Sequence, residues 1–214
     1  MPGFSERWIE IQLKDIAEKG AADRNQRHKE IAEKTYRKLD ANYGILSLSE
    51  TPSETRMWGH YAGGGRGFVI ELDAKHAWFH AMRNSDDGYN ELTKAEYVAR
   101  RPPKNLLEIK DEVLYTKSES WRYEQEWRIV RSFNDAKRKL GRLDTYGKEI
   151  LLFAVPPDVI KGVIIGFSAE SELEIAIRSA LAQNSDLRHS EIRRAAQSAE
   201  TGQVNIVSMK GVIA

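Results

Sequence analysis

The stretch from Leu46 to Leu72, LSLSETPSETRMWGHYAGGGRGFVIEL, contains four structural signals in close succession. Its apolar start favours a buried strand. The TPSE turn at 51–54 predicts a helix start with Ser53 as the N-cap, and the three glycines at 63–65 predict the end of that helix. Arg66 then opens a second strand, GFVIEL. Any fold for this chain must therefore hold two strands and a helix joined by very short connections.

The N-terminal part of the chain is more polar than the rest. Apolar residues recur at helical spacing over residues 4–19 and 22–40, and Gly20 predicts the end of the first helix. The second helix has a thin apolar face, which favours packing at an edge of the protein or contact with a partner protein. We therefore divide the chain into a charged helical segment, residues 1–43, and a domain over residues 44–214.

The elements after the central stretch do not alternate strictly between strand and helix. The apolar runs at 150–155 and 162–167 are typical of central strands covered on both faces. The other predicted elements are a helix at 74–84, a loop at 85–88, a strand at 91–99, a helix at 104–116, a strand that follows a turn or short helix at 120–133, a basic loop or hairpin at 134–142, a helix at 169–183 capped by Ser168, and a closing hairpin around 200–202. This order predicts an α+β fold with a mixed, largely antiparallel sheet, flanking helices and a helical N-terminal lead-in.

The composition limits which kinds of site are available. The chain of 214 residues contains no cysteine, which excludes disulfides, thiolate zinc sites and cysteine nucleophiles. The HExxH motif is absent, and we predict no metal site. No apolar run approaches the roughly 20 residues that cross a bilayer, and the N-terminus lacks the apolar core of a signal peptide. We therefore expect a cytoplasmic protein with no membrane partner.

The predicted helix before the glycines carries the first group of candidate site residues. Trp58 and Tyr61 are interpreted either as core aromatics or as ligand contacts. His60 directly precedes the glycine loop, and a histidine near neutrality donates, accepts or transfers a proton. The loop itself is either a tight helix-to-strand turn or a nest of amides that binds an anion. It is not a Walker loop, because it follows a helix and lacks the Gly-Lys-Ser/Thr ending.

A second group lies between Tyr115 and Val130, in YTKSESWRYEQEWRIV. If strand geometry holds from Glu124 onward, Glu124, Glu126 and Arg128 project on the same side. Two adjacent carboxylates raise the pKa of one of them, which would provide an acid or base. The alternative is an Arg–Glu ladder that stabilises the sheet. The candidate residues of this group are Tyr115, Lys117, Trp121, Tyr123, Glu124, Glu126 and Arg128.

Cationic side chains outside this group leave further alternatives open. Arg66 would either bind an anion or pair with Glu71 or Glu126. The clusters at 137–142 and 188–194 are either solvated loops and strand faces or a groove for nucleic acid. Because the net charge is only +1, attraction to nucleic acid is not a property of the whole chain.

The two motifs resemble those of a bacterial family called domain of unknown function 2971. The first, a serine-rich strand, MW-x-HY, a glycine loop and GF-x-I, is matched by residues 46–73. The second is matched by Lys117, Trp121, Tyr123, Glu124, Glu126, Trp127 and Arg128. The resemblance continues through Val163 to Gly166 and covers the chain from about Gly44. Family members usually begin with a strand and an Asn-Asp-Pro-Phe-Glu-like turn, which this sequence lacks. Either the sequence is truncated or the missing part comes from elsewhere.

The order of elements is also loosely similar to ADP-ribosyltransferase-like toxins, whose late strand often carries Glu-x-Glu, as in Glu124-Gln125-Glu126. This resemblance implies an enzyme of a toxin or phage-defence system that transfers or hydrolyses at a nucleotide, with NAD as its cofactor. The implied catalytic residues are Glu126, Glu124 and His60. The implied ligand-binding residues are Trp58, Tyr61, Arg66, Tyr115, Lys117, Trp121 and Arg128.

Two other functions remain open. The chain would otherwise be a non-catalytic module that binds a nucleotide, or a partner protein through residues 1–43, or a protein that processes nucleic acid through its basic clusters. The enzyme hypothesis requires that the histidine-tyrosine helix and the glutamate strand share a cleft. If their side chains are sealed in mutual contacts, a structural role is the better interpretation.

Overall fold

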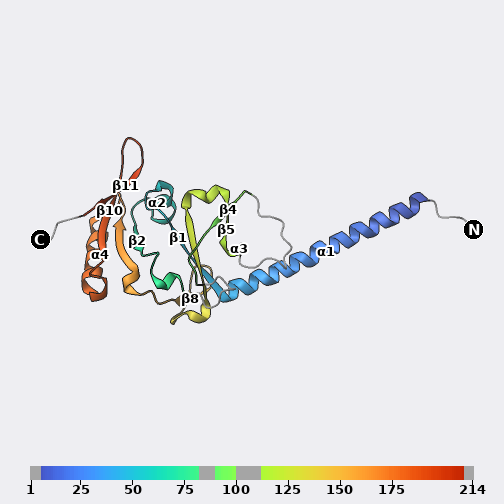
Figure 1. Ribbon diagram of the computed structural model, residues 1–214, viewed down its shortest axis with the longest axis horizontal. Helices are drawn as coiled ribbons and strands as arrows, with labels where there is room; N and C mark the ends of the chain where they lie inside the picture. The colour runs from blue at the N-terminus through green and yellow to red at the C-terminus, as the bar shows by residue number, and fades with distance from the viewer. Residues whose placement is uncertain (1–5, 82–89, 100–111, 210–214) are drawn as a thin grey trace, which may run out of the picture.

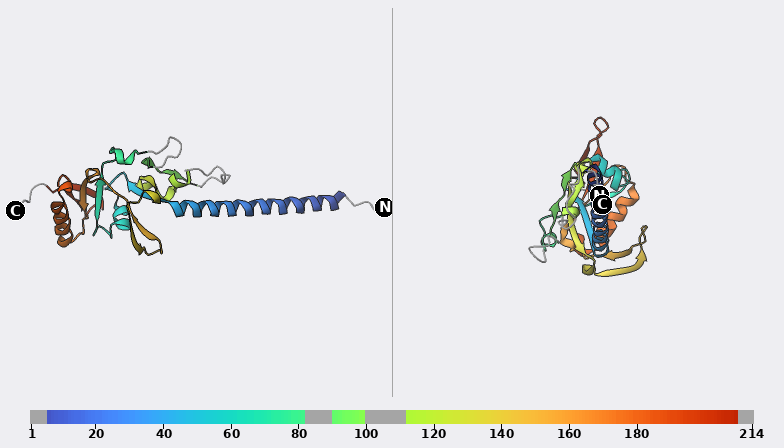
Figure 2. Two further views of the ribbon diagram at one scale, coloured as in Figure 1. Left: turned by 90° about the horizontal axis from the view of Figure 1, so that it is seen from below. Right: turned by 90° about the vertical axis from the view of Figure 1, so that its right-hand side faces the viewer.

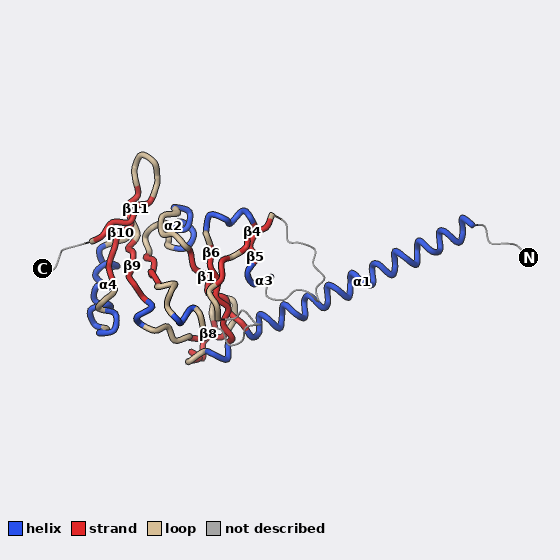
Figure 3. Tube along the Cα trace, viewed as in Figure 1, coloured by secondary structure: helices blue, strands red, loops and turns tan. Residues whose placement is uncertain are grey.

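The computed structural model describes residues 6–81, 90–99 and 112–209 (Figures 1 and 2). A long helix extends away from a body of small sheets and short helices (Figure 3). The described elements confirm an α+β fold, and most of the strand pairings among them are antiparallel. Within these ranges, no helix combines the length and the apolar character that crossing a membrane requires.

The long helix is α1 (Glu6–Asn42), which runs through the position where we predicted a break. The prediction of two helices, at 4–19 and 22–40, was therefore wrong, and residues 4 and 5 lie outside the described residues. A glycine inside a helix costs roughly 1 kcal/mol relative to alanine, but unlike proline it keeps its backbone hydrogen bond. Two alanines follow Gly20 directly, so the local preference returns to helix at once.

One three-stranded sheet has the order β1 (Tyr43–Ser49), β6 (Glu126–Ser132) and β3 (Thr93–Lys94). Ser49 pairs with Glu126 and Leu48 pairs with Trp127, both in antiparallel register. Since successive side chains of a strand alternate between faces, this sheet has one polar and one apolar face. Its apolar face contributes Leu48, Trp127 and Ile129 to a core around Phe79.

A second sheet has the order β11 (Val204–Ser208), β10 (Glu191–Gln197), β9 (Ile160–Ile165) and β2 (Phe68–Leu72). The run GVIIGF indeed forms a central strand, because β9 is buried between a helix on each face. Val163 and Ile165 pack with Ile177 of α4 (Ser171–Gln183), whereas Ile164 packs with Trp58 of α2 (Thr55–Tyr61). The predicted closing hairpin is confirmed as the antiparallel pair β10–β11.

The apolar run at 150–155 does not form a central strand. Its residues up to Leu152 belong to β8 (Glu149–Leu152), which pairs only with β7 (Arg138–Leu143) in a separate two-stranded hairpin. The prediction was wrong because an apolar run does not reveal how many neighbours a strand has. The basic segment at 134–142 does enter a hairpin, as one of our two alternatives predicted.

Three other predicted elements differ from the prediction or are described only in part. Of the helix predicted at 74–84, the described residues 74–81 contain the turn η1 (Ala77–Phe79), in which the His76 imidazole accepts the Trp78 amide at 3.0 Å, and residues 82–84 lie outside the described residues. The strand at 91–99 is divided into β3 and β4 (Glu96–Val98) at Ala95. Of the helix at 104–116, only α3 (Glu112–Tyr115) lies in the described residues. The loop at 85–88 lies outside them.

The remaining elements are short. Strand β4 pairs in parallel with β5 (Thr116–Ser118). The other 3₁₀ helices are η2 (Glu119–Glu124), η3 (Phe133–Asp135), η4 (Pro157–Val159) and η5 (Ser185–Leu187). Glu170 is at the N-cap position of α4, without a capping hydrogen bond from its side chain, so the prediction of Ser168 as the cap was wrong. The Ser168 amide instead donates to the Gly65 carbonyl at 2.9 Å, in the connection before α4.

Candidate functional site

The helix α2 is held in place by its buried tryptophan. Trp58 donates its indole N–H to the Pro52 carbonyl at 2.7 Å, and its ring centroid lies 6.1 Å from that of Phe167. The helix is capped by Glu54, whose carboxylate accepts the Arg56 amide at 3.1 Å, so the prediction of Ser53 as the cap was wrong. Of the two interpretations of Trp58, its burial supports the core aromatic.

The glycine loop is a packing turn. The amides of Gly64 and Gly65 donate to the Trp58 carbonyl at 3.1 and 3.3 Å, and that of Gly67 donates to Ala62 at 2.9 Å. These amides are therefore not free to form an anion nest. Gly65 has a φ of 82°, and a Cβ there would collide with the ring of Phe167. Glycine is required because this turn lies directly against the end of β9.

The last residue of α2 connects the first motif to the second. The Tyr61 hydroxyl donates to Glu124 Oε1 at 2.9 Å. Lys117 contacts the other oxygen of Glu124 and also lies 2.9 Å from Glu126 Oε2. Arg128 binds both oxygens of Glu126, at 2.9 and 3.0 Å. We call these five side chains the charge network.

The two carboxylates meet because of the backbone between them. The helix η2 ends at Glu124, and β6 begins at Glu126. Gln125, between them, has φ 45° and ψ 53°, a left-handed conformation that is uncommon for a residue with a side chain. The prediction that strand geometry starts at Glu124 was therefore wrong. The turn is held by the Gln125 carbonyl, which accepts the Glu50 amide, and by Ser49, which donates to the Glu124 carbonyl.

The electrostatics of the network keep Glu126 ionised. Burial alone would raise the pKa of Glu126, but hydrogen bonds from Arg128, Ser47 and Lys117 lower it to about 2. Glu126 is therefore not a carboxylate whose pKa is raised by its neighbour, because two cations outweigh the neighbouring carboxylate. Burial would lower the pKa of Lys117, yet Glu124 and Glu126 raise it. Each glutamate is only 3% exposed.

An aromatic surface lies outside the charge network. The rings of His60 and Trp121 are 6.1 Å apart, and Tyr123 lies 5.9 Å from Trp121 and 6.5 Å from His60. The Lys117 amine lies 5.3 Å from the centre of the Trp121 ring, so this surface covers part of the network. Trp121 is 38% exposed and Tyr61 is 65% exposed.

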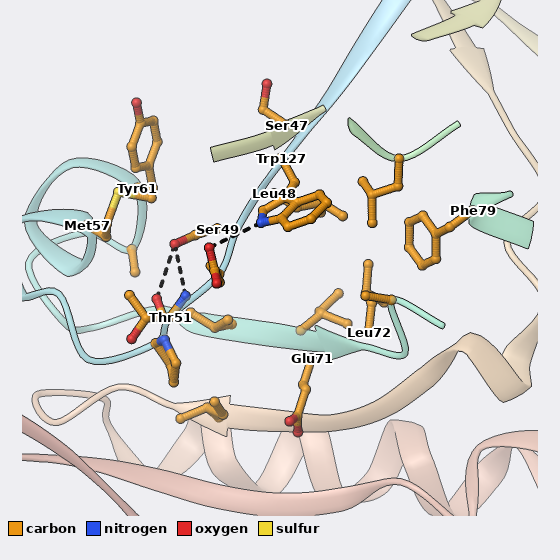
Figure 4. A pocket seen from close by; sticks show the side chains of 18 of the residues that line it. Ser47, Leu48, Ser49, Thr51, Met57, Tyr61, Glu71, Leu72, Phe79 and Trp127 are labelled. Atoms are coloured by element: carbon orange, nitrogen blue, oxygen red, sulfur yellow. Dashed lines mark hydrogen bonds between the residues drawn. The ribbon is translucent and has the colours of Figure 1, made fainter. Parts of the chain in front are cut away.

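A pocket of about 700 Å³ lies between β1 and β2 (Figure 4). Leu48 and Trp127 line it on the side of β1 and β6, and all five residues of β2 line it on the other side. Its lining is mostly apolar; Ser49 and Thr51 provide polar groups at one end. The residues that line it are Ser47, Leu48, Ser49, Glu50, Thr51, Pro52, Met57, Trp58, Tyr61, Ala62, Phe68, Val69, Ile70, Glu71, Leu72, Ala74, Lys75, Phe79, His80, Leu92, Trp127 and Ile164.

The pocket and the buried carboxylate lie on opposite faces of the β1–β6 sheet. Glu126 projects from the polar face, whereas Leu48 and Trp127 project from the apolar face toward the pocket. Glu124, Glu126 and His60 are not among the lining residues. Tyr61 belongs to both regions, because it lines the pocket and its hydroxyl reaches Glu124.

Among the described residues, no contact joins Arg66 to this network. Arg66 is exposed in the turn between Gly65 and Gly67. Neither of its predicted partners is available, because Glu71 pairs with Arg193 and Glu126 pairs with Arg128 and Lys117. Tyr115 ends α3 directly before β5, and the carbonyls on either side of it, at 114 and 116, accept from Arg128.

Sequence reasoning missed two residues that support the network. Ser47 hydrogen-bonds to Glu126, and the Tyr97 hydroxyl accepts the Glu126 amide at 2.8 Å. The alternation of Ser47 and Ser49 with leucines was a signal for the first, because it marks the polar face of β1. No local signal marks Tyr97, which comes from another sheet. Among the described residues, no three His, Asp or Glu side chains are grouped so that they could hold a metal ion.

The geometry thus defines an α+β domain in which two motifs form one buried charge network beside an apolar pocket. Residues 57–129 match the family described as protein of unknown function (DUF2971). The candidate site residues of both motifs lie inside this segment, so the predicted resemblance is confirmed over residues 57–129. Its extension to Gly44 and through Val163 to Gly166 stays a prediction. The chain matches none of the curated proteins and none of the solved structures with which it was compared. The similarity to ADP-ribosyltransferase-like toxins stays a prediction.

Proposed function

We propose that this protein binds a nucleotide in the pocket between β1 and β2. The observation that carries the proposal is the position of Tyr61. Its side chain lines the pocket, and its hydroxyl is bonded to a glutamate of the charge network. A ligand in the pocket would therefore contact a side chain that is hydrogen-bonded to Glu124 and, through Glu124, linked to the rest of the charge network.

The chemistry of the pocket suits a base and a ribose. Its volume of about 700 Å³ lies within the roughly 300–1,000 Å³ that is usual for small-molecule sites. Trp127, Phe68 and Phe79 are aromatic residues of the lining, and a planar base stacks favourably on such rings. Thr51 provides a hydroxyl group at one end, and exposed Lys75 provides a cation for a phosphate.

The burial of Glu126 supports binding more than catalysis. Its two oxygens are bound by Arg128 and Lys117, and its pKa of about 2 makes it a poor base. It also lies on the face of the sheet that is turned away from the pocket. For Glu126, the geometry supports our alternative of an Arg–Glu pair that stabilises the sheet.

A second candidate function is transfer or hydrolysis at the ribose of NAD. It is favoured by the contact between Glu124 and Tyr61, because Tyr61 is two-thirds exposed and provides a path from the surface to this carboxylate. In this candidate, Glu124 would stabilise positive charge on the ribose, and Tyr61 would first move aside. A role in a toxin or phage-defence system stays a prediction.

Thermal denaturation with NAD, ADP-ribose, AMP and the other nucleoside monophosphates tests the binding proposal. A ligand at a hundred times its dissociation constant should stabilise the fold by about 2.7 kcal/mol. The variant Ile70→Trp places an indole in the pocket from a half-exposed strand position and should abolish the stabilisation. Ile175→Trp, at an exposed position on α4, is the matched control and should retain it.

The result that would contradict binding is a panel in which no nucleotide shifts the transition, or a shift that survives Ile70→Trp. The second candidate is tested separately by release of nicotinamide from NAD. If the protein releases none, or if Glu124→Gln releases it as fast as the natural chain, the transferase candidate is rejected. Binding without turnover supports the first proposal alone.

A further inference from the structure

The sequence predicts the same two alternatives for the basic clusters at 137–142 and 188–194, and the structure shows that the two clusters differ in their ion pairs. In the cluster at 188–194, Arg193 pairs with Glu71. Arg194 pairs with Glu174 at 3.0 Å and donates to the Ala169 carbonyl at 2.8 Å. These two guanidinium groups already have partners within the fold, so this cluster offers little charge to another molecule.

The cluster at 137–142 is different, because it lies on the hairpin of β7 and β8. We define the basic hairpin as residues 137–149, which contain five cations and two carboxylates. The cations, all exposed, are Lys137, Arg138, Lys139, Arg142 and Lys148. Lys139 lies 3.7 Å from Glu149, and Lys148 lies 2.6 Å from Asp40. In the described part of the chain, no ion pair engages Lys137, Arg138 or Arg142.

The turn of the basic hairpin presents an aromatic ring to solvent. Tyr146 is 87% exposed. The Asp144 carboxylate accepts the amides of Tyr146 and Lys148 at 2.8 and 2.9 Å, and Gly147 has a φ of 77°. The carboxylate is therefore used to build the turn, which has a defined conformation with its tyrosine directed outward.

We propose that the basic hairpin binds single-stranded nucleic acid, with phosphates along β7 and a base stacked on Tyr146. This goes beyond nucleotide binding in the pocket and does not depend on it. From Arg138 to Arg142 the strand extends about 13 Å at roughly 3.3 Å per residue. Single-stranded nucleic acid is recognised by positive grooves or ribbons combined with aromatic side chains that stack on its bases. The ring of Tyr146 requires an unpaired base, since the faces of paired bases are covered by their neighbours.

Fluorescence anisotropy with labelled oligo-uridylate and oligo-thymidylate of about 12 nucleotides tests this proposal, since single-strand sites span about 4–16 nucleotides. We expect binding to both, with affinity that falls as salt is raised from about 50 to 200 mM. Arg138→Ala/Arg142→Ala should reduce the slope of log affinity against log salt by about 1.4, because each phosphate contact on a single strand contributes about 0.7. Tyr146→Ala should weaken binding at least about fivefold, and Tyr146→Phe should retain it, because the ring is kept.

The control variant Lys29→Ala/Arg188→Ala removes the same charge from exposed positions outside the basic hairpin. It should leave the salt slope within error of the natural chain. An equal loss in this control would overturn the proposal, because binding would then depend on net charge alone. The proposal is also overturned if neither oligonucleotide binds at low salt, or if the chain binds anionic phospholipid vesicles but no oligonucleotide. The pocket variant Ile70→Trp should bind oligonucleotides normally, so the two proposals fail separately.

Discussion

At the scale of single residues, Glu126 has the most demanding environment in the described structure. Its carboxylate is almost fully buried and contacts two cations, Arg128 and Lys117. Two cations and the two carboxylates of the network balance in charge. Removal of one partner from such a set leaves the others buried without compensation, and this costs more than the intact pair contributes.

We therefore expect Glu126→Gln to destabilise the protein by about 3–5 kcal/mol, the usual cost of breaking a buried ion pair. The free energy of unfolding in urea measures this. Glu172→Gln, at an exposed position on α4, is the matched control and should change it by less than about 0.5 kcal/mol. A loss for Glu126→Gln no larger than for the control would show that the network does not stabilise the fold.

The same carboxylate predicts a dependence of stability on pH. The folded-state pKa of Glu126 is about 2, below its ordinary value of 4.5. The unfolded state therefore binds protons more readily, and the stabilisation is present above about pH 4.5 and is lost as pH falls toward 2. It amounts to about 3 kcal/mol, at 1.36 kcal/mol per pKa unit.

Urea unfolding of the natural chain and of Glu126→Gln between pH 6 and the acid limit of folding measures this contribution. The difference in stability between the two should shrink as the pH is lowered, because the natural glutamate then becomes neutral as well. A difference that stays constant with pH would contradict the assignment.

At the scale of elements, the glycine turn after α2 determines how this helix meets β9. Gly63 and Gly65 both have positive φ, but only at Gly65 would a Cβ collide with another side chain, Phe167. At Gly63 the space is open. Alanine substitutions at Gly63 and Gly65 therefore distinguish the cost of backbone strain alone from the cost of strain combined with a steric clash.

Gly63→Ala should cost about 1–2 kcal/mol, the penalty of a left-handed residue with a side chain. Gly65→Ala should cost more, because the ring of Phe167 must also move. The free energies of unfolding of the two variants, compared directly, provide the measurement. Equal losses would show that the turn has room at Gly65, against the packing described above.

The elements show where sequence reasoning succeeds and where it stops. The strand, helix and glycine turn around α2 were predictable because each has its own local signal. The continuity of α1 through Gly20 was not predictable, because the loss of helix stability from one glycine is too small to decide between a break and a continued helix. The position of β8 in a hairpin was not predictable either, because strand neighbours are chosen by contacts distant in sequence.

The candidate site shows the same limit. The density of acidic and aromatic residues predicted that the two motifs form one group, and the contact between Tyr61 and Glu124 joins them. The left-handed conformation of Gln125, which aims both carboxylates at Lys117, has no sequence signature. The sequence did not predict the pocket between β1 and β2, since its position depends on how two sheets face each other.

At the scale of the whole molecule, α1 extends away from the body (Figures 1 and 2). The contact of its C-terminal end with the body includes the ion pair between Asp40 and Lys148. A helix that projects in this way contributes little to the stability of the body, and its use as a surface for a partner protein stays a prediction.

Deletion of residues 1–30 should therefore change the free energy of unfolding of the body by less than about 1 kcal/mol, which is within the range of surface changes. Urea unfolding monitored by the tryptophan fluorescence of the body, which includes the buried Trp58, measures it. Asp40→Ala, at the junction itself, provides a comparison, and it should cost at most about 1 kcal/mol because the pair with Lys148 is exposed. A large loss on deletion would mean that the helix is part of the folding unit.

The hydrogen bond between Tyr61 and Glu124 has a consequence for protein engineering. A chimera that receives only the segment with Glu124 from a relative would hold this carboxylate without the tyrosine hydroxyl that binds it. A chimera that receives only the helix with Tyr61 would have the converse mismatch. The two segments should therefore be exchanged together, although more than fifty positions separate them in the chain.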